Sequence, residues 1–219
     1  MTSQGTLRLG GLAMVVGAVL SFVSTLVSAL FFVGSDPSPY ANNPLYVPDN
    51  LLGLLGTALL LLGVPLLYLA SADRWGVLGL IGFVLLFFTG LMFGIFFSLL
   101  SVLLIPYLVQ HAPDTFKGNG PPAFFPFFIL GTVFEVVSAV LLAIPMIRGL
   151  VADRWVGYLL LAAAVLVVVS FFLGGPGGPT NLLLSLVSNL SALLLFTALG
   201  WLGYRLWMAH RGLREQLGV

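Results

Sequence analysis

One acidic residue stands deep inside an apolar stretch of this sequence, and it is the first candidate for chemistry. Glu135 lies near the middle of the apolar run from Ala123 to Ile147. Thr132 and Ser138 are three residues to either side, so in a helix the three side chains share one face. A carboxyl group in such a setting is costly unless it is protonated, paired or in contact with water. Glu135 is therefore either a proton or ligand site, or a protonated hydrogen-bond donor that holds helices together.

Small and polar residues that could face Glu135 recur at helical spacing near both ends of the chain. The first apolar stretch carries Gly17, Ser21, Ser24, Thr25 and Ser28, and the last carries Ser185, Ser188, Asn189 and Ala192. Such stripes let neighbouring helices approach closely and exchange hydrogen bonds. The sequence therefore predicts a polar seam between the first, fourth and sixth helices, with Glu135 in it.

A metal site is only weakly indicated. His111, Asp114 and Lys117 follow one another at a spacing of three in a polar segment, and Asp36 or Asp49 could complete a divalent site with the first two. Two or three scattered ligands are a weak pattern, and a solvated loop explains them more simply. Neither histidine of the chain stands in an identifiable nucleophile motif. We expect no catalytic residue and lean against an enzyme.

Composition also argues against a cofactor. The chain has no cysteine, which excludes thiolate metal sites and iron–sulfur clusters. A retinal-type Schiff base needs a lysine inside the bundle, yet the single lysine, Lys117, is in a polar segment. His111 and His210 fall at the ends of apolar runs, too far from the membrane centre for a buried haem. We expect no cofactor.

The overall composition indicates whether the surface of the chain faces water or lipid. Of 219 residues, 60% are hydrophobic and 7% are charged, against about a quarter charged in soluble domains. So few ionisable groups cannot cover a water-soluble fold, and the excess apolar surface must face lipid. The net charge of +1 gives no reason to expect nucleic acid as a partner.

Six apolar stretches can be recognised, and most reach the length of about 20 residues that a spanning helix needs. They are Leu7–Val33, Leu51–Ala70, Gly76–Gln110, Ala123–Ile147, Val156–Leu173 and Asn181–Met208. In lipid these segments must be helical, because open strands leave backbone groups unpaired. The third is too long for a perpendicular span and is expected to tilt, protrude or bend near Pro106. The prediction is an all-α bundle of six transmembrane helices in a single domain.

The basic residues predict the orientation. Seven arginines fall at the start of the chain, in the loops after the second and fourth helices, or at the end of the chain: Arg8, Arg74, Arg148, Arg154, Arg205, Arg211 and Arg214. Only Lys117 falls on the other side. This asymmetry predicts that both termini are cytoplasmic, with the chain in the cell membrane. The dominance of arginine over lysine indicates a prokaryotic source. All four tryptophans lie toward the arginine side, where they are expected to form an aromatic belt.

Two segments of the chain resemble each other. Residues 61–75 and 141–155 align without gaps, with an identical proline (Pro65, Pro145) and an identical closing tetrapeptide. That tetrapeptide is Ala72, Asp73, Arg74 and Trp75 in the first copy and Ala152, Asp153, Arg154 and Trp155 in the second. The pattern predicts three tandem helical hairpins, near 1–75, 76–155 and 156–219, and the tetrapeptides are expected to stabilise the turns.

Three functions remain open. The sparse chemistry favours a non-catalytic membrane module, either a subunit, a scaffold, or a binder of lipids or hydrophobic ligands. Its partners would be the bilayer and another membrane protein or a second copy of the chain. A small proton-linked transporter or channel that uses Glu135 is the first alternative. A membrane-embedded enzyme is the last, because no polar cluster supports one.

Overall fold

The computed structural model describes the chain except for residues 1–2, 33–36, 117–123, 152, 175–181 and 209–219. The described residues form helices and contain no strand. The long helices are α1 (Ser3–Phe31), α2 (Tyr46–Leu69), α3 (Ala72–Thr89), α6 (Phe124–Ile147), α7 (Arg154–Gly174) and α8 (Leu182–Met208). Six helical segments are long and apolar enough to cross a membrane. The expected all-α, six-span bundle is confirmed, and the chain is a multi-pass membrane protein.

The third span is composite. After α3 it continues as a π-helix, η1 (Gly90–Phe96), then as α4 (Phe97–Leu103), α5 (Ile105–His111) and the 3₁₀ turn η2 (Pro113–Phe116). The expected break near Pro106 is present between α4 and α5, since proline cannot donate the backbone hydrogen bond that would continue the helix. The π-helix was not predicted. In it the Phe97 N–H donates to the Met92 carbonyl, five residues back.

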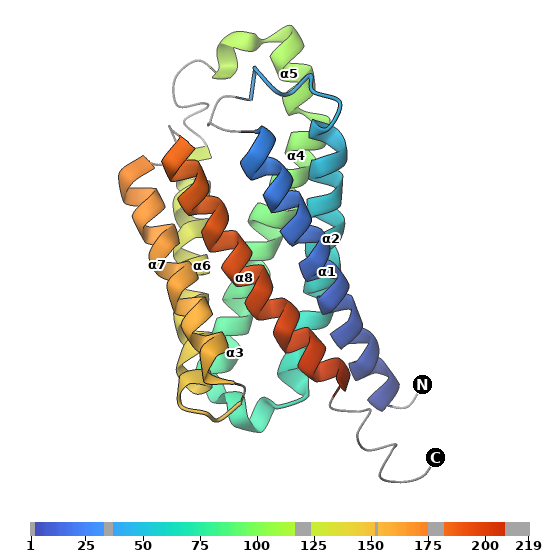
Figure 1. Ribbon diagram of the computed structural model, residues 1–219, viewed down its shortest axis with the longest axis vertical. Coiled ribbons are helices and arrows are strands. Elements are labelled where there is room, and N and C mark those ends of the chain that lie inside the picture. The colour runs from blue at the N-terminus through green and yellow to red at the C-terminus, as the bar shows by residue number, and fades with distance from the viewer. Residues whose placement is uncertain (1–2, 33–36, 117–123, 152, 175–181, 209–219) are drawn as a thin grey trace.

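The helices form a closed ring. In it α1 packs against α2 and α8, α3 against α6, α6 against α7, and α7 against α8 (Figure 1). The composite span packs against both α2 and α6: α3 contacts both helices, whereas η1 and α4 contact α2 closely and reach α6 through aromatic rings. Glycines permit the closest approaches: a Cβ on Gly17 would lie 2.5 Å from the Gly56 carbonyl oxygen, and one on Gly11 2.8 Å from that of Gly203.

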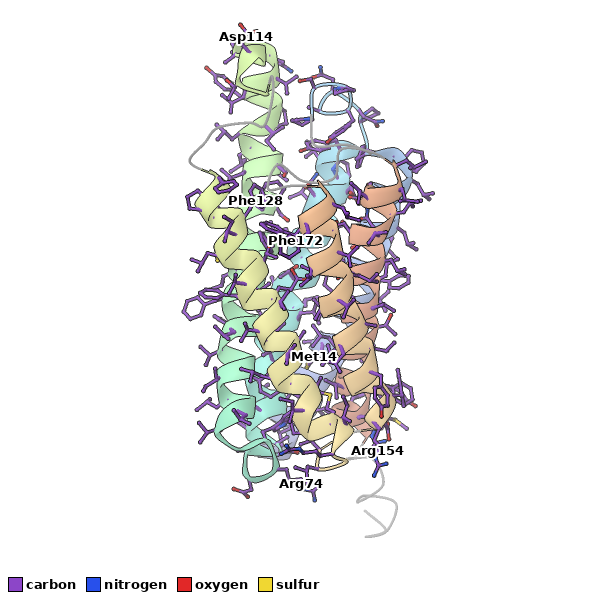
Figure 2. The ribbon with its side chains drawn as sticks, turned by 90° about the vertical axis from the view of Figure 1, so that its left-hand side faces the viewer. Met14, Arg74, Asp114, Phe128, Arg154 and Phe172 are labelled. Atoms are coloured by element: carbon purple, nitrogen blue, oxygen red, sulfur yellow. The ribbon has the colours of Figure 1, made fainter. Side chains whose placement is uncertain are left out.

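The two ends of the bundle differ in packing. The start of α1 and the end of α8 lie at one end with Arg74 and Arg154, here called the basic end, and Asp114 lies at the other (Figures 1 and 2). The core is densest toward the basic end. Its most deeply buried large side chains, each at most 1% exposed, are Met14, Leu142, Met146, Val156 and Leu160. This half of the bundle is a closely packed apolar core.

Candidate functional site

Glu135 lines a cavity inside the bundle. The cavity has a volume of about 380 Å³ and receives side chains from α2, α3, η1, α6, α7 and α8. On α6, Phe128, Thr132 and Glu135 follow one another at spacings of four and three, so one helix face presents all three to the cavity. The carboxyl group of Glu135 has no hydrogen bond or ion pair with any described residue. An acidic group is thus available inside the membrane-spanning region.

The remaining polar lining consists of hydroxyl groups. These belong to Thr57, Thr89, Thr132, Ser170, Ser188 and Ser191. Two of them have already given their proton to a backbone carbonyl: Thr89 Oγ1 donates to Leu85 at 3.0 Å, and Ser191 Oγ donates to Ala163 at 2.9 Å. Their oxygens can therefore only accept a further hydrogen bond. The rest of the wall is apolar.

The cavity is closed toward the basic end by the packed core. Five residues belong both to the core and to the lining: Leu60, Val64, Leu86, Leu195 and Leu199. Because such a core contains few voids larger than a water molecule, these side chains form a packed floor among the residues that the structure describes. The cavity is therefore closed on the side of the basic end, and a ligand or water must reach it from the membrane or from the end where Asp114 lies.

Aromatic rings form the seam between η1 and α6 beside the cavity. The Phe93 ring centroid lies 6.0 Å from that of Phe128 and 6.2 Å from that of Phe127. Gly131 makes room for this arrangement, since a Cβ there would lie 2.4 Å from Phe93 Cζ. Figure 2 shows Phe128 in the half of the bundle toward Asp114. Side-chain rings, rather than close backbone packing, therefore fill the space between η1 and α6.

The predicted polar seam is only partly assembled. Thr132, Glu135 and Ser188 line the cavity together. Ser138 is buried outside it and donates to the Glu135 backbone carbonyl at 2.8 Å. Asn189 donates to the Ser185 carbonyl at 2.7 Å, within its own helix. Helical spacing correctly placed polar residues on a face but could not separate those that reach the cavity from those that bond to their own backbone.

The prediction that helix one faces Glu135 is wrong. Its polar stripe packs against α2: Ser28 Oγ donates to Asp49 Oδ2 at 2.7 Å and Ser24 Oγ to the Asp49 carbonyl at 3.0 Å. Ser21 adjoins Gly56 of α2, and Thr25 donates to the Ser21 carbonyl. No described residue of α1 lines the cavity.

Asp49 is a buried carboxyl group whose position the sequence analysis did not predict correctly. It was expected in a loop, but α2 begins at Tyr46, and Asp49 lies in its first turn with 5% of its surface exposed. Its Oδ1 atom has no hydrogen-bond partner. The signal available in the sequence was an acidic residue at a helix start, where the helix dipole favours negative charge.

No metal centre forms around the candidate ligands. The described residues contain no group of three His, Cys, Asp or Glu side chains that could hold an ion. His111 Nδ1 lies 3.0 Å from the Tyr107 carbonyl, and the two rings stack at 4.2 Å. Asp114 is in η2, whereas Asp36 and Lys117 lie outside the described residues.

The two tetrapeptide turns have different structures. Residues Ala72, Asp73 and Arg74 start α3 as a turn that ends at Gly76, whose φ of +60° suits glycine. Trp75 is 2% exposed and lies 4.8 Å from the Phe83 ring, so its placement in a membrane-facing belt was wrong.

In the second copy Ala152 is outside the described residues, and α7 begins at Arg154. Trp155 is 42% exposed. Asp153 accepts hydrogen bonds from Trp201 Nε1 and Arg205 Nη1, both at 2.9 Å to Oδ2, which ties the start of α7 to α8. Sequence similarity did not indicate that one tryptophan is core and the other surface.

Comparison of the chain with protein-family models, with curated proteins and with solved structures found no match. Fold and site define the class: a six-span membrane protein with an internal, acid-lined cavity. What the cavity does must be argued from its own chemistry.

Proposed function

We propose that this chain is a membrane binding protein that takes a small, largely apolar ligand into the cavity and contacts its one polar group with Glu135. Among the non-catalytic roles open to the sequence, a hydrophobic-ligand binder fits the structure best. Ligand sites in proteins are mostly apolar cavities of about 300–1,000 Å³ with a few convergent polar groups. The cavity described above has that size and that lining.

One observation carries the proposal: a carboxyl group without a protein partner opens onto a pocket with a closed floor. A purely structural Glu135 would be expected to donate to a neighbouring helix, because an unsatisfied polar group in the membrane costs free energy. An open floor would favour a channel instead. A cavity that is closed at one end favours a binding site over a channel.

Photolabelling tests this proposal. An octanol that carries a diazirine is photolysed with the purified chain in lipid nanodiscs, and the modified residues are mapped by mass spectrometry. We expect labelled positions around Thr132, Glu135 and Ser188, and competition by excess octanol.

Two substitutions on the same helix provide the control. Ala192→Phe reduces the cavity and should lower this labelling, whereas Leu190→Phe, at a position 47% exposed toward lipid, should not. Labelling confined to the lipid-facing surface, or insensitive to Ala192→Phe, contradicts the proposal.

Proton-linked transport is the second candidate, and the aromatic seam favours it. Phe128 lies in the half of the bundle toward Asp114 and lines the cavity beside Phe93, and rotation of these two rings needs no movement of a helix. Proteoliposomes with an imposed pH gradient test this: ligand uptake that depends on Glu135 supports transport, and binding without uptake leaves a binder.

We also propose the cytoplasmic orientation of the basic end, and three tandem hairpins as the origin of the fold. The arginine asymmetry supports the orientation. Pro65 and Pro145, each near the end of its helix at the basic end, support the repeat.

A further inference from the structure

The chemistry of the cavity wall limits which polar group a ligand can bring. Among the described residues, the lining contains no lysine, arginine or histidine, and its one ionisable side chain is Glu135. An anionic head group would meet a carboxyl group of the same charge and no compensating cation. Fatty acids and phosphate-bearing lipids are therefore poor ligands for this site.

The hydroxyl groups of the lining favour the same class of ligand. Thr89 and Ser191 have used their protons on the carbonyls of Leu85 and Ala163, so toward the cavity their oxygens only accept. Glu135 adds two more acceptor oxygens when it is ionised. Every polar side chain that lines the cavity can accept a hydrogen bond, and two of the hydroxyl groups can only accept, which suits a ligand that carries positive charge or donates hydrogen bonds.

Aromatic rings complete the environment. The lining includes Phe93, Phe128, Phe171 and Phe196, contributed by η1, α6, α7 and α8. The face of an aromatic ring attracts a cation, and the attraction grows when water is excluded. The same rings provide apolar contact for the substituents of an organic cation, which a hydrated metal ion would not use.

Resting on the proposed function, we infer that the ligand is a lipophilic organic cation, an ammonium with apolar substituents, whose charge lies against Glu135 and the surrounding phenylalanine rings. A cation in the cavity compensates a carboxylate that otherwise has no partner there. A neutral ligand of the same length gains the apolar contacts but not the charge interaction.

Competition by three compounds of equal chain length tests the inference. Octyltrimethylammonium, octanol and octanoate compete with the diazirine-bearing octanol for the cavity in nanodiscs. We expect the cation to compete at a concentration at least about tenfold lower than octanol, which corresponds to about 1.4 kcal/mol of binding free energy, and octanoate to be the weakest. Glu135→Gln should abolish the advantage of the cation while photolabelling of the cavity persists.

Asp49→Asn is the matched control, because it removes the other buried carboxyl group of the described spans without touching the cavity. It should preserve the order of the three compounds. If octanol labels the cavity but competes as well as the cation, the inference is overturned and the binding function stands. If no compound of the series reaches the cavity, the binding function itself fails. An advantage of the cation that survives Glu135→Gln also overturns the inference.

Discussion

Alanine at Gly94 should destabilise the bundle, whereas alanine at Gly90, one helical turn earlier, should not. A Cβ on Gly94 would lie 2.2 Å from Cγ2, 2.5 Å from Oγ1 and 2.7 Å from Cβ of Thr57 on α2. Because Thr57 is β-branched and buried, rotation of its side chain cannot clear all three contacts. A Cβ on Gly90 would meet Leu61 Cδ2 at 2.7 Å, the end of a flexible side chain that can turn into the cavity.

The magnitudes follow from two opposing effects. Overpacking costs about 1–3 kcal/mol, and replacing a helical glycine with alanine gains about 0.5–1 kcal/mol. We expect Gly94→Ala to lose about 1–2 kcal/mol of the free energy of unfolding, since the cost exceeds the gain. For Gly90→Ala we expect no loss, or a gain of up to about 1 kcal/mol, because Leu61 can adapt.

Unfolding by SDS in mixed micelles, followed by tryptophan fluorescence, measures both variants. Thr57→Ala removes Cγ2 and Oγ1, so in the Gly94→Ala background it should recover part of the loss, with a coupling of at least about 0.5 kcal/mol. Equal stability of the two glycine variants, or strict additivity with Thr57→Ala, would refute the packing of η1 against α2.

Three further predictions concern the rest of the molecule. Asp153→Asn weakens the ion pair with Arg205, in which Asp153 is 34% and Arg205 is 55% exposed. The free energy of unfolding in SDS should therefore fall by less than about 1 kcal/mol, and a decrease twice as large would contradict a solvent-exposed ion pair. Asp49→Ala leaves the Ser28 hydroxyl without its acceptor and should lower the free energy of unfolding by about 1–3 kcal/mol. Asp49→Asn should lower it less, and the reverse order would contradict the hydrogen bond between Ser28 and Asp49. Because the chain has no cysteine of its own, a single introduced cysteine reports on its own position. A membrane-impermeant maleimide applied to intact cells should label Asp114→Cys but not Arg74→Cys, and the opposite pattern would contradict the proposed orientation.

The sequence was sufficient for the spans because their hydropathy requires no knowledge of the partner helix. Glu135 was recognisable for the same reason, as a charge in the middle of an apolar run. Its surroundings were not. Periodicity shows that Ser28 and Ser188 lie on polar faces, but only packing decides that Ser28 bonds to Asp49 while Ser188 faces the cavity.

The cavity also depends on a feature with no sequence signature. The π-helix η1 packs its backbone against α2, and its Phe93 ring occupies the space beside Gly131 of α6. Gly90 and Gly94, four residues apart in η1, pack against Leu61 and Thr57 of α2. The change in hydrogen-bond pattern between them could not be foreseen, because the backbone rather than a particular side chain carries it.

Whether small molecules reach Glu135 can be measured directly on two single-cysteine variants of α6. Thr132 lines the cavity and Ser138, on the next turns of the same helix, is buried outside it. We predict that N-ethylmaleimide modifies Thr132→Cys, that octanol slows this reaction, and that Ser138→Cys stays unmodified in the folded protein. Equal modification of both positions, or a Thr132→Cys reaction that octanol leaves unchanged, would contradict an accessible ligand cavity at the centre of this bundle.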